Sequence, residues 1–345
     1  MLQSTSSVEP DEAIAEWATL DDEWIEMSTA QPLQVEFRQI LISPEQHGMR
    51  FDMALSLVLE DFSRSYVHTL IAQQRVKALN SLGQGFLKPS TKVKAGQQFE
   101  VEIRPSLQSQ AYKPQPMEIE TIFEDDHLRV IAKPAGLVVH PAPGNWTGTL
   151  LNGLLALDQM SWHLPRAGIV HRLDKDTTGL MVVARTRACM DALTTLISQR
   201  QIKRQYLALV HHAWQGSGRD VELPIGRDPR QRLRMAVVDQ ARYPGKYAKT
   251  HFDCLDSNDQ ASLLHCTLST GRTHQIRVHL SHLGHPLVGD ALYGGKSLAQ
   301  LARQALHAHR LGFLHPMTGK ACQWIQPLPT DMMTALETLG LSYNP

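Results

Sequence analysis

The sequence predicts an α+β fold, because strand-like and helix-like segments follow one another without regular alternation. The same irregular order disfavours a Rossmann or barrel plan, and repeats at the periods of solenoid proteins are absent. The chain has 345 residues, 42% of them hydrophobic and 20% charged, which is typical of a globular protein. At roughly 150 residues per domain, this length indicates about two domains.

Charge and composition divide the chain into four segments. Residues 1–34 form an acidic tail, which we expect to be disordered. Residues 35–104 have the pattern of a small folded domain. Residues 105–117 are rich in Pro, Gln and Ser and indicate a linker. Residues 118–345 are then the larger domain.

The small domain is expected to combine two helices with strands. Residues 35–42 are predicted to form an edge strand, and the apolar residues of 51–59 follow helical spacing. Ser63 is placed to cap a second helix over residues 66–71. Apolar residues alternate over 99–103, which predicts a further strand.

The larger domain mixes strands and helices. Its predicted strands are Leu128–Lys133, Leu180–Ala184, Tyr206–His211 and Ser262–Leu268. Its predicted helices are Cys189–Ile197, Gln275–Leu283 and a final helix that Thr330 caps and Gly340 ends.

Several classes of protein are excluded by the sequence. It has no apolar run long enough to span a membrane, and its acidic start is not that of a secretory signal. The four cysteines are far apart and form no C-x-x-C motif, so zinc ribbons and thioredoxin-like sites are not expected. A reducing, cytoplasmic location is therefore the expectation.

The net charge of zero hides a basic body. Residues 1–37 contain nine acidic residues and no Lys or Arg, so the remainder carries 34 bases against 25 acids. Basic proteins often bind polyanions, of which nucleic acid is the commonest. The charge alone fits a solubilising surface equally well.

The most informative stretch is residues 168–184, with the sequence GIVHRLDKDTTGLMVVA. Asp174 lies among His171, Arg172 and Lys175, and neighbouring cations keep a carboxylate ionised. An ionised carboxylate can act as a nucleophile. Taken alone, however, this pattern fits a structural ion pair better.

Two further stretches contain candidate functional side chains. Arg277, near the start of a predicted helix, can fork onto a carboxylate in a bidentate manner. Tyr206, in a predicted strand, could present its ring to a base or its hydroxyl to a proton. Each residue also has an ordinary structural interpretation. Arg277 could be an exposed arginine on a helix, and Tyr206 could be a half-buried tyrosine in a strand.

Taken together and in this order, these stretches closely resemble the RluA family of RNA pseudouridine synthases. The resemblance covers about residues 118–340, and the run 174–184 looks most like the RluD type, which acts on large-subunit ribosomal RNA. The motifs that carry it are residues 133–141, 171–179, 204–206, 271–277, 284–290 and 306–316.

The small domain resembles an S4 RNA-binding domain, in which Arg64 and Arg75 would contact RNA. The matching residues are 50–52, 63–64, 74–76, 88–90 and 95–97. The Val-Asn-Gly turn usual in that family is replaced by a different sequence at residues 76–83.

The resemblance implies a fold and a reaction. The fold is a catalytic domain with a central mixed, mainly antiparallel sheet, plus a small α/β S4-like domain. The family breaks the N-glycosidic bond of a uridine, turns the uracil, and joins it to the same ribose through carbon. No metal or other cofactor is implied, so His307 and His309 are expected to pack rather than to bind metal.

The resemblance also implies residue roles. Asp174 matches the catalytic aspartate, which could attack the sugar, take a proton from it, or add to the base. Arg277 matches the arginine that pairs with this aspartate. Arg172 matches the residue that enters the RNA stack once the uridine is flipped out. Tyr206 matches the tyrosine that packs against the flipped base, with proton removal as a lesser role for its hydroxyl.

Further substrate contacts are expected around these residues. Ile276 would give the pocket an apolar wall, and His171 and Leu173 flank Arg172. Residues 199–251 contain eleven bases against four acids, and residues 227–234 look like a basic hairpin or loop. Arg232 in that hairpin is expected to contact RNA phosphate.

The expected partner is 23S rRNA or a precursor of the large ribosomal subunit, at the intersubunit stem-loop that RluD-type enzymes modify. A monomer is expected. The alternatives are an RluC-type synthase that acts on other uridines of the same RNA, or a non-catalytic S4-domain RNA-binding factor. A glycoside hydrolase would need a second carboxylate, for which Asp176 is the nearby candidate.

Overall fold

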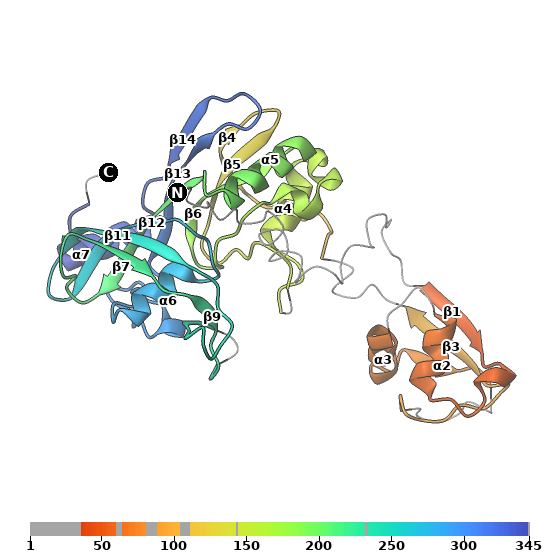
Figure 1. Ribbon diagram of the computed structural model, residues 1–345. Coiled ribbons are helices and arrows are strands. Elements are labelled where there is room, and N and C mark those ends of the chain that lie inside the picture. The colour runs from red at the N-terminus through yellow and green to blue at the C-terminus, as the bar shows by residue number, and fades with distance from the viewer. Residues whose placement is uncertain are drawn as a thin grey trace, which may run out of the picture. The chain divides into compact units, whose positions relative to one another are not determined.

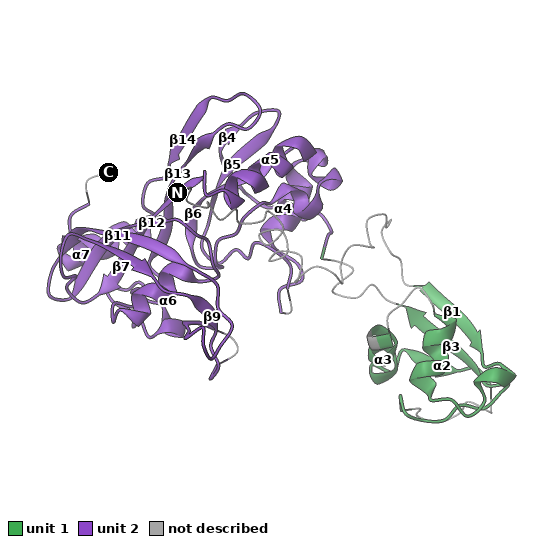
Figure 2. Ribbon diagram, in the orientation of Figure 1, with its two compact units in different colours: residues 1–111 green, residues 112–345 purple. Residues whose placement is uncertain are grey.

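The computed structural model describes residues 36–59, 64–80, 88–103, 111–142, 144–231 and 234–343. The chain forms two compact units, residues 1–111 and 112–345 (Figure 2). Their boundary lies inside the segment that composition predicts to be a linker. The predicted acidic tail, the cap at Ser63 and the candidate phosphate contact Arg232 lie outside the described residues.

The smaller unit is a three-stranded sheet with two helices, as the sequence predicts. Phe99, Val101 and Ile103 alternate along β3 and therefore point to one face, where they form a core with Phe51 and Val67. The strand order is β1-β3-β2, which makes β1 an edge strand. The bounds are β1 Glu36–Leu41, η1 Pro44–Gln46, α2 Phe51–Val58, α3 Arg64–Ala72, β2 Val76–Ala78 and β3 Gln98–Ile103.

The larger unit is built on a nine-stranded mixed sheet (Figure 1). Its order is β4-β5-β6-β13-β7-β12-β11-β8, and β14 also pairs with β13. Every pairing is antiparallel except β6 with β13, which confirms the expected sheet. The strands are β4 Glu120–Glu124, β5 Leu128–Lys133, β6 Thr178–Ala184, β7 Lys203–His211, β8 Gly218–Glu222, β11 Lys249–Ser257, β12 Ala261–Leu268, β13 Leu306–Leu314 and β14 Ala321–Ile325.

Helices cover both faces of this sheet. Alternate residues of β7 point to opposite faces, so Tyr206 and Ala208 share a core with α4 and α6, whereas Leu207 packs with α7. Helix α5 covers β5 and β6 on the face opposite α4. The helices are α4 Leu150–Leu157, α5 Arg187–Ser198, α6 Gln275–His282 and α7 Thr330–Leu339.

Shorter elements complete the larger unit. Strands β9 (Ile225–Arg227) and β10 (Met235–Val237) pair antiparallel and flank the segment predicted to be a basic hairpin or loop. The prediction that Thr330 caps the last helix is wrong, because α7 begins at Thr330 and its N-cap is Pro329. The remaining elements are the 3₁₀ helices η4 Gln159–His163, η5 Pro165–Gly168 and η6 Ala291–Tyr293. Among the described residues, no helix is long and apolar enough to cross a membrane.

The short parallel pairing of β6 with β13 depends on a glycine. Gly179 pairs with Ala308, which pairs in turn with Tyr206 of β7. Gly179 has φ of +112°, and a Cβ there would lie 2.2 Å from the carbonyl oxygen of Ala308. Only glycine fits this close approach, which sets where the preceding loop enters the sheet.

Candidate active site

The loop of residues 169–177 carries Asp174 and is held by side chains from other elements. Lys133, at the end of β5, is buried and its Nζ donates to the carbonyl of Lys175 at 2.8 Å. Arg303 donates from Nη1 to the carbonyl of Asp176 at 3.1 Å. The Asp174 side chain keeps 17% exposure, so a fixed loop presents a carboxylate that substrate can reach.

Lys133 is unusual because its ammonium is buried and, among the described residues, no carboxylate forms an ion pair with it. Nζ donates three hydrogen bonds of 2.8 Å, to the carbonyls of Pro134, Leu137 and Lys175. Burial lowers the pKa of Lys133 to about 8, against the opposing effect of the Asp176 and Asp174 charges. The lysine therefore ties the loop that follows β5 to the loop that carries Asp174.

Residues 171–173 alternate between the interior and the surface. His171 and Leu173 are 4% exposed, whereas Arg172 is exposed. The His171 ring accepts a hydrogen bond at Nε2 from the Val182 amide at 3.0 Å, and burial lowers the pKa of His171 to about 3. Of the three expected substrate contacts, the structure places Arg172 at the surface and the other two inside.

Arg277 lies between two carboxylates. Its Nη1 donates to Asp174 at 2.8 Å, while Nε and Nη2 donate to Asp290 at 2.7 and 2.9 Å. Burial alone lowers the pKa of Arg277, but the Asp290 hydrogen bonds and the Asp174 charge raise it above its ordinary value. Asp290 is 2% exposed, so this bidentate pair fixes the guanidinium that Asp174 contacts.

His274 and Tyr293 lie next to the ion pair of Asp174 and Arg277. His274 Nε2 is 3.7 Å from Asp174 Oδ1, and its Nδ1 is 2.8 Å from the Tyr293 hydroxyl. The Arg277 guanidinium carbon is 4.9 Å from the centre of the Tyr293 ring. Burial lowers the pKa of His274, although the Asp174 charge raises it. A neutral imidazole therefore accompanies Arg277 beside the carboxylate.

Tyr206 and Ile276 belong to the hydrophobic core that includes Leu173, the residue before Asp174. They are 6% and 4% exposed. Burial raises the pKa of the Tyr206 hydroxyl, the charge of Arg204 lowers it, and that of Asp174 raises it. The structure thus brings together Asp174, Arg277, Tyr206 and Ile276, all of which the sequence singled out.

The site also contains residues that the sequence analysis gave no role. Asp290 and Tyr293 lie in the segment that follows α6, and His274 lies immediately before α6. The sequence did contain a signal for Asp290, because this residue ends the motif at residues 284–290, but that motif alone gave it no role. Sequence spacing does not reveal that this turn folds back to place Asp290 against Arg277.

The candidate RNA contacts of the smaller unit are engaged in ion pairs within it. Arg64 Nη2 lies 2.8 Å from Asp52, whose pKa is lowered to about 2, chiefly by the hydrogen bond from Arg50. Arg75 Nη1 lies 3.2 Å from Glu102. The Arg64 side chain is nevertheless 56% exposed, so it remains accessible from solvent.

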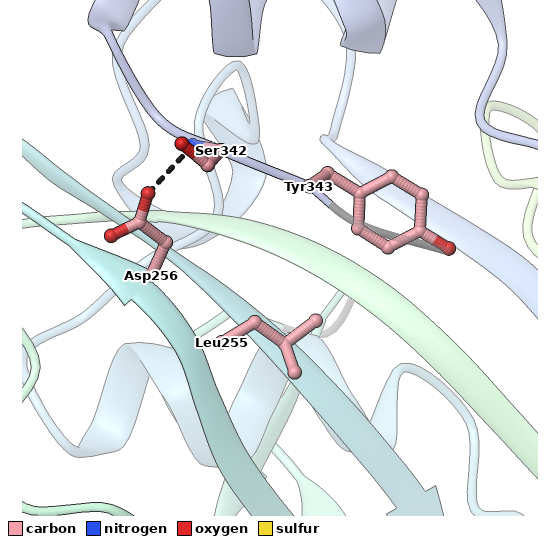
Figure 3. Close-up of a pocket in the computed structure, with 4 residues that line it drawn as sticks. All are labelled: Leu255, Asp256, Ser342 and Tyr343. Atoms are coloured by element: carbon pink, nitrogen blue, oxygen red, sulfur yellow. Dashed lines mark hydrogen bonds between the residues drawn. The ribbon is translucent and has the colours of Figure 1, made fainter.

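A separate pocket lies at the far end of β11, between that strand and the C-terminal segment (Figure 3). It is lined by Leu255, Asp256, Ser342 and Tyr343, and the Asp256 carboxylate accepts a hydrogen bond from the Ser342 amide at 2.6 Å. At the opposite end of β11, Gln275 of α6 donates hydrogen bonds to the Lys249 carbonyl and the Thr250 hydroxyl. This pocket is therefore not part of the Asp174 site.

Within the described ranges, no group of three or more His, Cys, Asp or Glu side chains could hold a metal ion. His307 Nδ1 lies 2.9 Å from the Thr178 hydroxyl, and His309 Nδ1 lies 2.8 Å from the Gln326 carbonyl. Both histidines are buried, and their rings are hydrogen-bonded within the fold.

Comparisons with known proteins identify the family. A family model described as RNA pseudouridylate synthase matches residues 127–282, which include Asp174, Tyr206 and Arg277. A Neisseria meningitidis (serogroup A) protein named ribosomal large subunit pseudouridine synthase D is 44% identical over 310 residues, 86% of this chain and 80% of the relative. The chain belongs to the RNA pseudouridylate synthase family.

Other pseudouridine synthases agree with this assignment. Proteins of the same name from Nitrosomonas europaea and Escherichia coli O157:H7 are 45% and 41% identical, over 85% and 88% of this chain and 85% and 94% of theirs. A solved structure of human RNA pseudouridylate synthase domain containing 4 superposes with a TM-score of 0.54 at 26% identity, covering 66% of this chain and 95% of the other. These findings confirm the resemblance to the RluD type, and the chain is an RNA pseudouridine synthase.

Proposed function

We propose that this pseudouridine synthase isomerises uridines of 23S rRNA, at the intersubunit stem-loop, with Asp174 as its catalytic carboxylate. The observation that carries the proposal is the pairing of Asp174 with Arg277 at 2.8 Å beside the buried Tyr206. The 41–45% identity to proteins named ribosomal large subunit pseudouridine synthase D supports the choice of RNA.

The chemistry requires an ionised carboxylate in a fixed position. Asp174 would attack the sugar carbon that carries the uracil, take a proton from the sugar, or add to the base. Each route needs the carboxylate close to the reacting atom and correctly oriented. Arg277 provides that orientation, because Asp290 holds its other two nitrogens.

The base must leave the RNA stack to reach Asp174. Enzymes that act on a base within paired nucleic acid flip it into a pocket. Arg172 is exposed two residues before Asp174, and its planar cation would fill the vacated position by stacking and hydrogen bonding. Tyr206 would pack against the flipped uracil, and Ile276 would supply the apolar wall.

Cationic residues outside the pocket would position the RNA by its phosphates. The candidates are Arg64 and Arg75 of the smaller unit, and Arg232, which lies between β9 and β10 in the sequence. Phosphate contacts of this kind add affinity without reading the base sequence. We assign His171 and Leu173 a different role, support of the Asp174 loop from the interior, because both are buried.

The proposal is tested by mapping pseudouridine in large-subunit rRNA from cells that lack the protein. The cells are then supplied with the native chain or with Asp174→Asn. We expect defined pseudouridines in the intersubunit stem-loop to disappear and to return only with the native chain. Loss at other uridines of the same RNA would reassign the target, and unchanged rRNA would overturn the choice of substrate.

A further inference from the structure

Arg204 carries a buried guanidinium that the proposed reaction does not use. Arg204 is the second residue of β7 and is 9% exposed. It lies two residues before Tyr206 and therefore points to the same face of the sheet. Among the residues that the structure describes, its Nε has no hydrogen-bond partner.

The surroundings of Arg204 place it beside the active site. A Cβ built on Gly271 would lie 2.7 Å from Arg204 Nη1, so the guanidinium rests against the loop that leads into α6. The charge of Arg204 lowers the pKa of both His171 and Tyr206. Arg204 thus lies near the loop that carries Asp174, the loop that carries His274, and the tyrosine between them.

No anion within the described residues compensates this cation. Burial lowers the pKa of Arg204, and the one group that raises it is the Tyr206 hydroxyl, not a carboxylate. Arg277 is the opposite case, because all three of its nitrogens donate to Asp174 or Asp290. Burying an unpaired charge is strongly unfavourable, so an anion from outside the chain is the natural partner of Arg204.

We propose that Arg204 binds a backbone phosphate of the RNA, next to the nucleotide that packs against Tyr206. The inference rests on the proposed function, because the phosphate belongs to the same substrate. A guanidinium can grip a phosphate through two parallel hydrogen bonds, which fixes geometry as well as charge. Because Gly271 has no side chain, the loop leaves room for that guanidinium at the edge of the site.

Arg204→Met tests this inference through two effects of opposite sign. Without RNA, we expect the melting temperature to stay the same or rise, because an uncompensated buried charge is removed. The Kd for the RNA segment that mapping identifies should rise about tenfold or more, as for a lost hydrogen bond to a charged group. The slope of log Kd against log salt concentration should fall by about 0.7, the value of one phosphate contact on single-stranded RNA.

Arg187→Met is the matched control. Arg187 lies on α5, is 67% exposed, and pairs with Asp191 on its own helix. We expect this variant to keep the native Kd and salt slope. RNA with single phosphates replaced by neutral methylphosphonates then locates the contact. One such replacement should weaken the native chain and leave Arg204→Met unaffected.

Three results would overturn the inference. If Arg204→Met keeps the native Kd and the native slope of log Kd against log salt concentration, Arg204 binds no phosphate. A change in the pH-rate profile through Tyr206 would not alter that conclusion. A raised Kd with the native slope would point to a neutral uracil oxygen instead. A lowered melting temperature with a native salt slope would assign Arg204 a purely structural role.

Failure of the inference can be told apart from failure of the proposed function. Pseudouridine formation by the native chain in the same RNA tests the function and does not involve the variant. Inorganic phosphate, with no RNA present, tests Arg204 alone. It should raise the melting temperature of the native chain above that in chloride of equal ionic strength, and Arg204→Met should lose this increment. An equal increment in both proteins contradicts the inference.

Discussion

Asp290 determines how Arg277 faces Asp174. A single hydrogen bond to Asp174 would leave the guanidinium free to rotate, but the bidentate contact with Asp290 fixes its plane. Asp290 is buried, and the Tyr293 ring stacks close to the same guanidinium. At the residue scale, therefore, Asp290 orients the arginine that contacts Asp174, the carboxylate that we propose to be catalytic.

Asp290→Asn should slow the reaction without weakening RNA binding. The amide keeps the shape of the side chain but removes a charge and one of the two acceptors of Arg277. Loss of one hydrogen bond to a charged group, about 1.5–3 kcal/mol, corresponds to roughly a tenfold to hundredfold lower single-turnover rate. Asp191→Asn on α5 is the control, and a native rate in Asp290→Asn would refute the orienting role.

Two substitutions of Tyr206 distinguish a role in base stacking from a role in proton transfer. We expect Tyr206→Phe to keep native affinity and most of the native rate, because the ring remains. Tyr206→Leu should bind RNA more weakly by about 1–3 kcal/mol, the usual contribution of a base stacked on an aromatic ring. Single-turnover rates and Kd values for both variants decide the point. A collapse of the rate in Tyr206→Phe would make the hydroxyl the functional group instead.

At the scale of elements, the neutral side chain of His171 links the loop of residues 169–177 to β6 by accepting a hydrogen bond from the Val182 amide. His171 has a pKa of about 3 in the fold because it is buried, whereas an unfolded histidine titrates near 6.5. Between these values the unfolded chain binds a proton that the folded chain does not. The stabilisation is therefore complete above about pH 6.5 and is lost as the pH falls toward 3.

His171→Gln should remove this pH dependence. Relative to the variant, the native chain is expected to lose up to about 1.4 kcal/mol of unfolding free energy for each pH unit between 6 and 4. Denaturant unfolding of both proteins across this range provides the measurement. Other buried histidines contribute equally to both curves, so parallel curves would show that His171 is not neutral in the fold.

Gly179 should tolerate no side chain. Its positive φ and the 2.2 Å approach to the Ala308 carbonyl predict that Gly179→Ala lowers the free energy of unfolding by about 2 kcal/mol or more. Gly312 on β13 is the matched control, because a Cβ there would lie 3.4 Å from its nearest atom. Gly312→Ala is expected to change stability by less than about 1 kcal/mol, and equal effects at both positions would contradict the packing argument.

At the scale of the whole molecule, the two units have separate hydrophobic cores. We therefore expect two unfolding transitions in calorimetry rather than one. The fragment 112–345 should retain the transition of the larger unit at an unchanged temperature. It should also form pseudouridine, with weaker RNA binding because Arg64 and Arg75 are missing. A single cooperative transition in the full chain would show that the units are energetically coupled.

Much of the fold was predictable because local patterns suffice for it. The six residues of Leu128–Lys133 form an uninterrupted buried strand with the predicted bounds. Charged runs before an apolar strand likewise located Asp174. What could not be predicted depends on contacts between distant segments. The parallel pairing of β6 with β13 and the contact of Asp290 with Arg277 are of this kind.

The burial of His171 and Leu173 also escaped prediction, because their motif mixes charged and apolar residues in a loop. Their burial follows from contacts between distant segments, such as the pairing of Ile169 with Val183 and the hydrogen bond from the Val182 amide to His171. Arg204 was noted only as part of a motif, since a sequence cannot show that a cation lacks a partner.

Tritium release from labelled RNA measures directly whether Asp174 drives uridine isomerisation. Unmodified 23S rRNA, tritiated at C5 of uridine, is incubated with the purified native chain, Asp174→Asn or the neighbouring control Asp176→Asn. The C5 hydrogen must leave when carbon joins the ribose, so tritium release reports the reaction. We predict release by the native chain and Asp176→Asn, and none by Asp174→Asn despite native RNA affinity. Release at the native rate by Asp174→Asn would show that Asp174 is not the catalytic carboxylate.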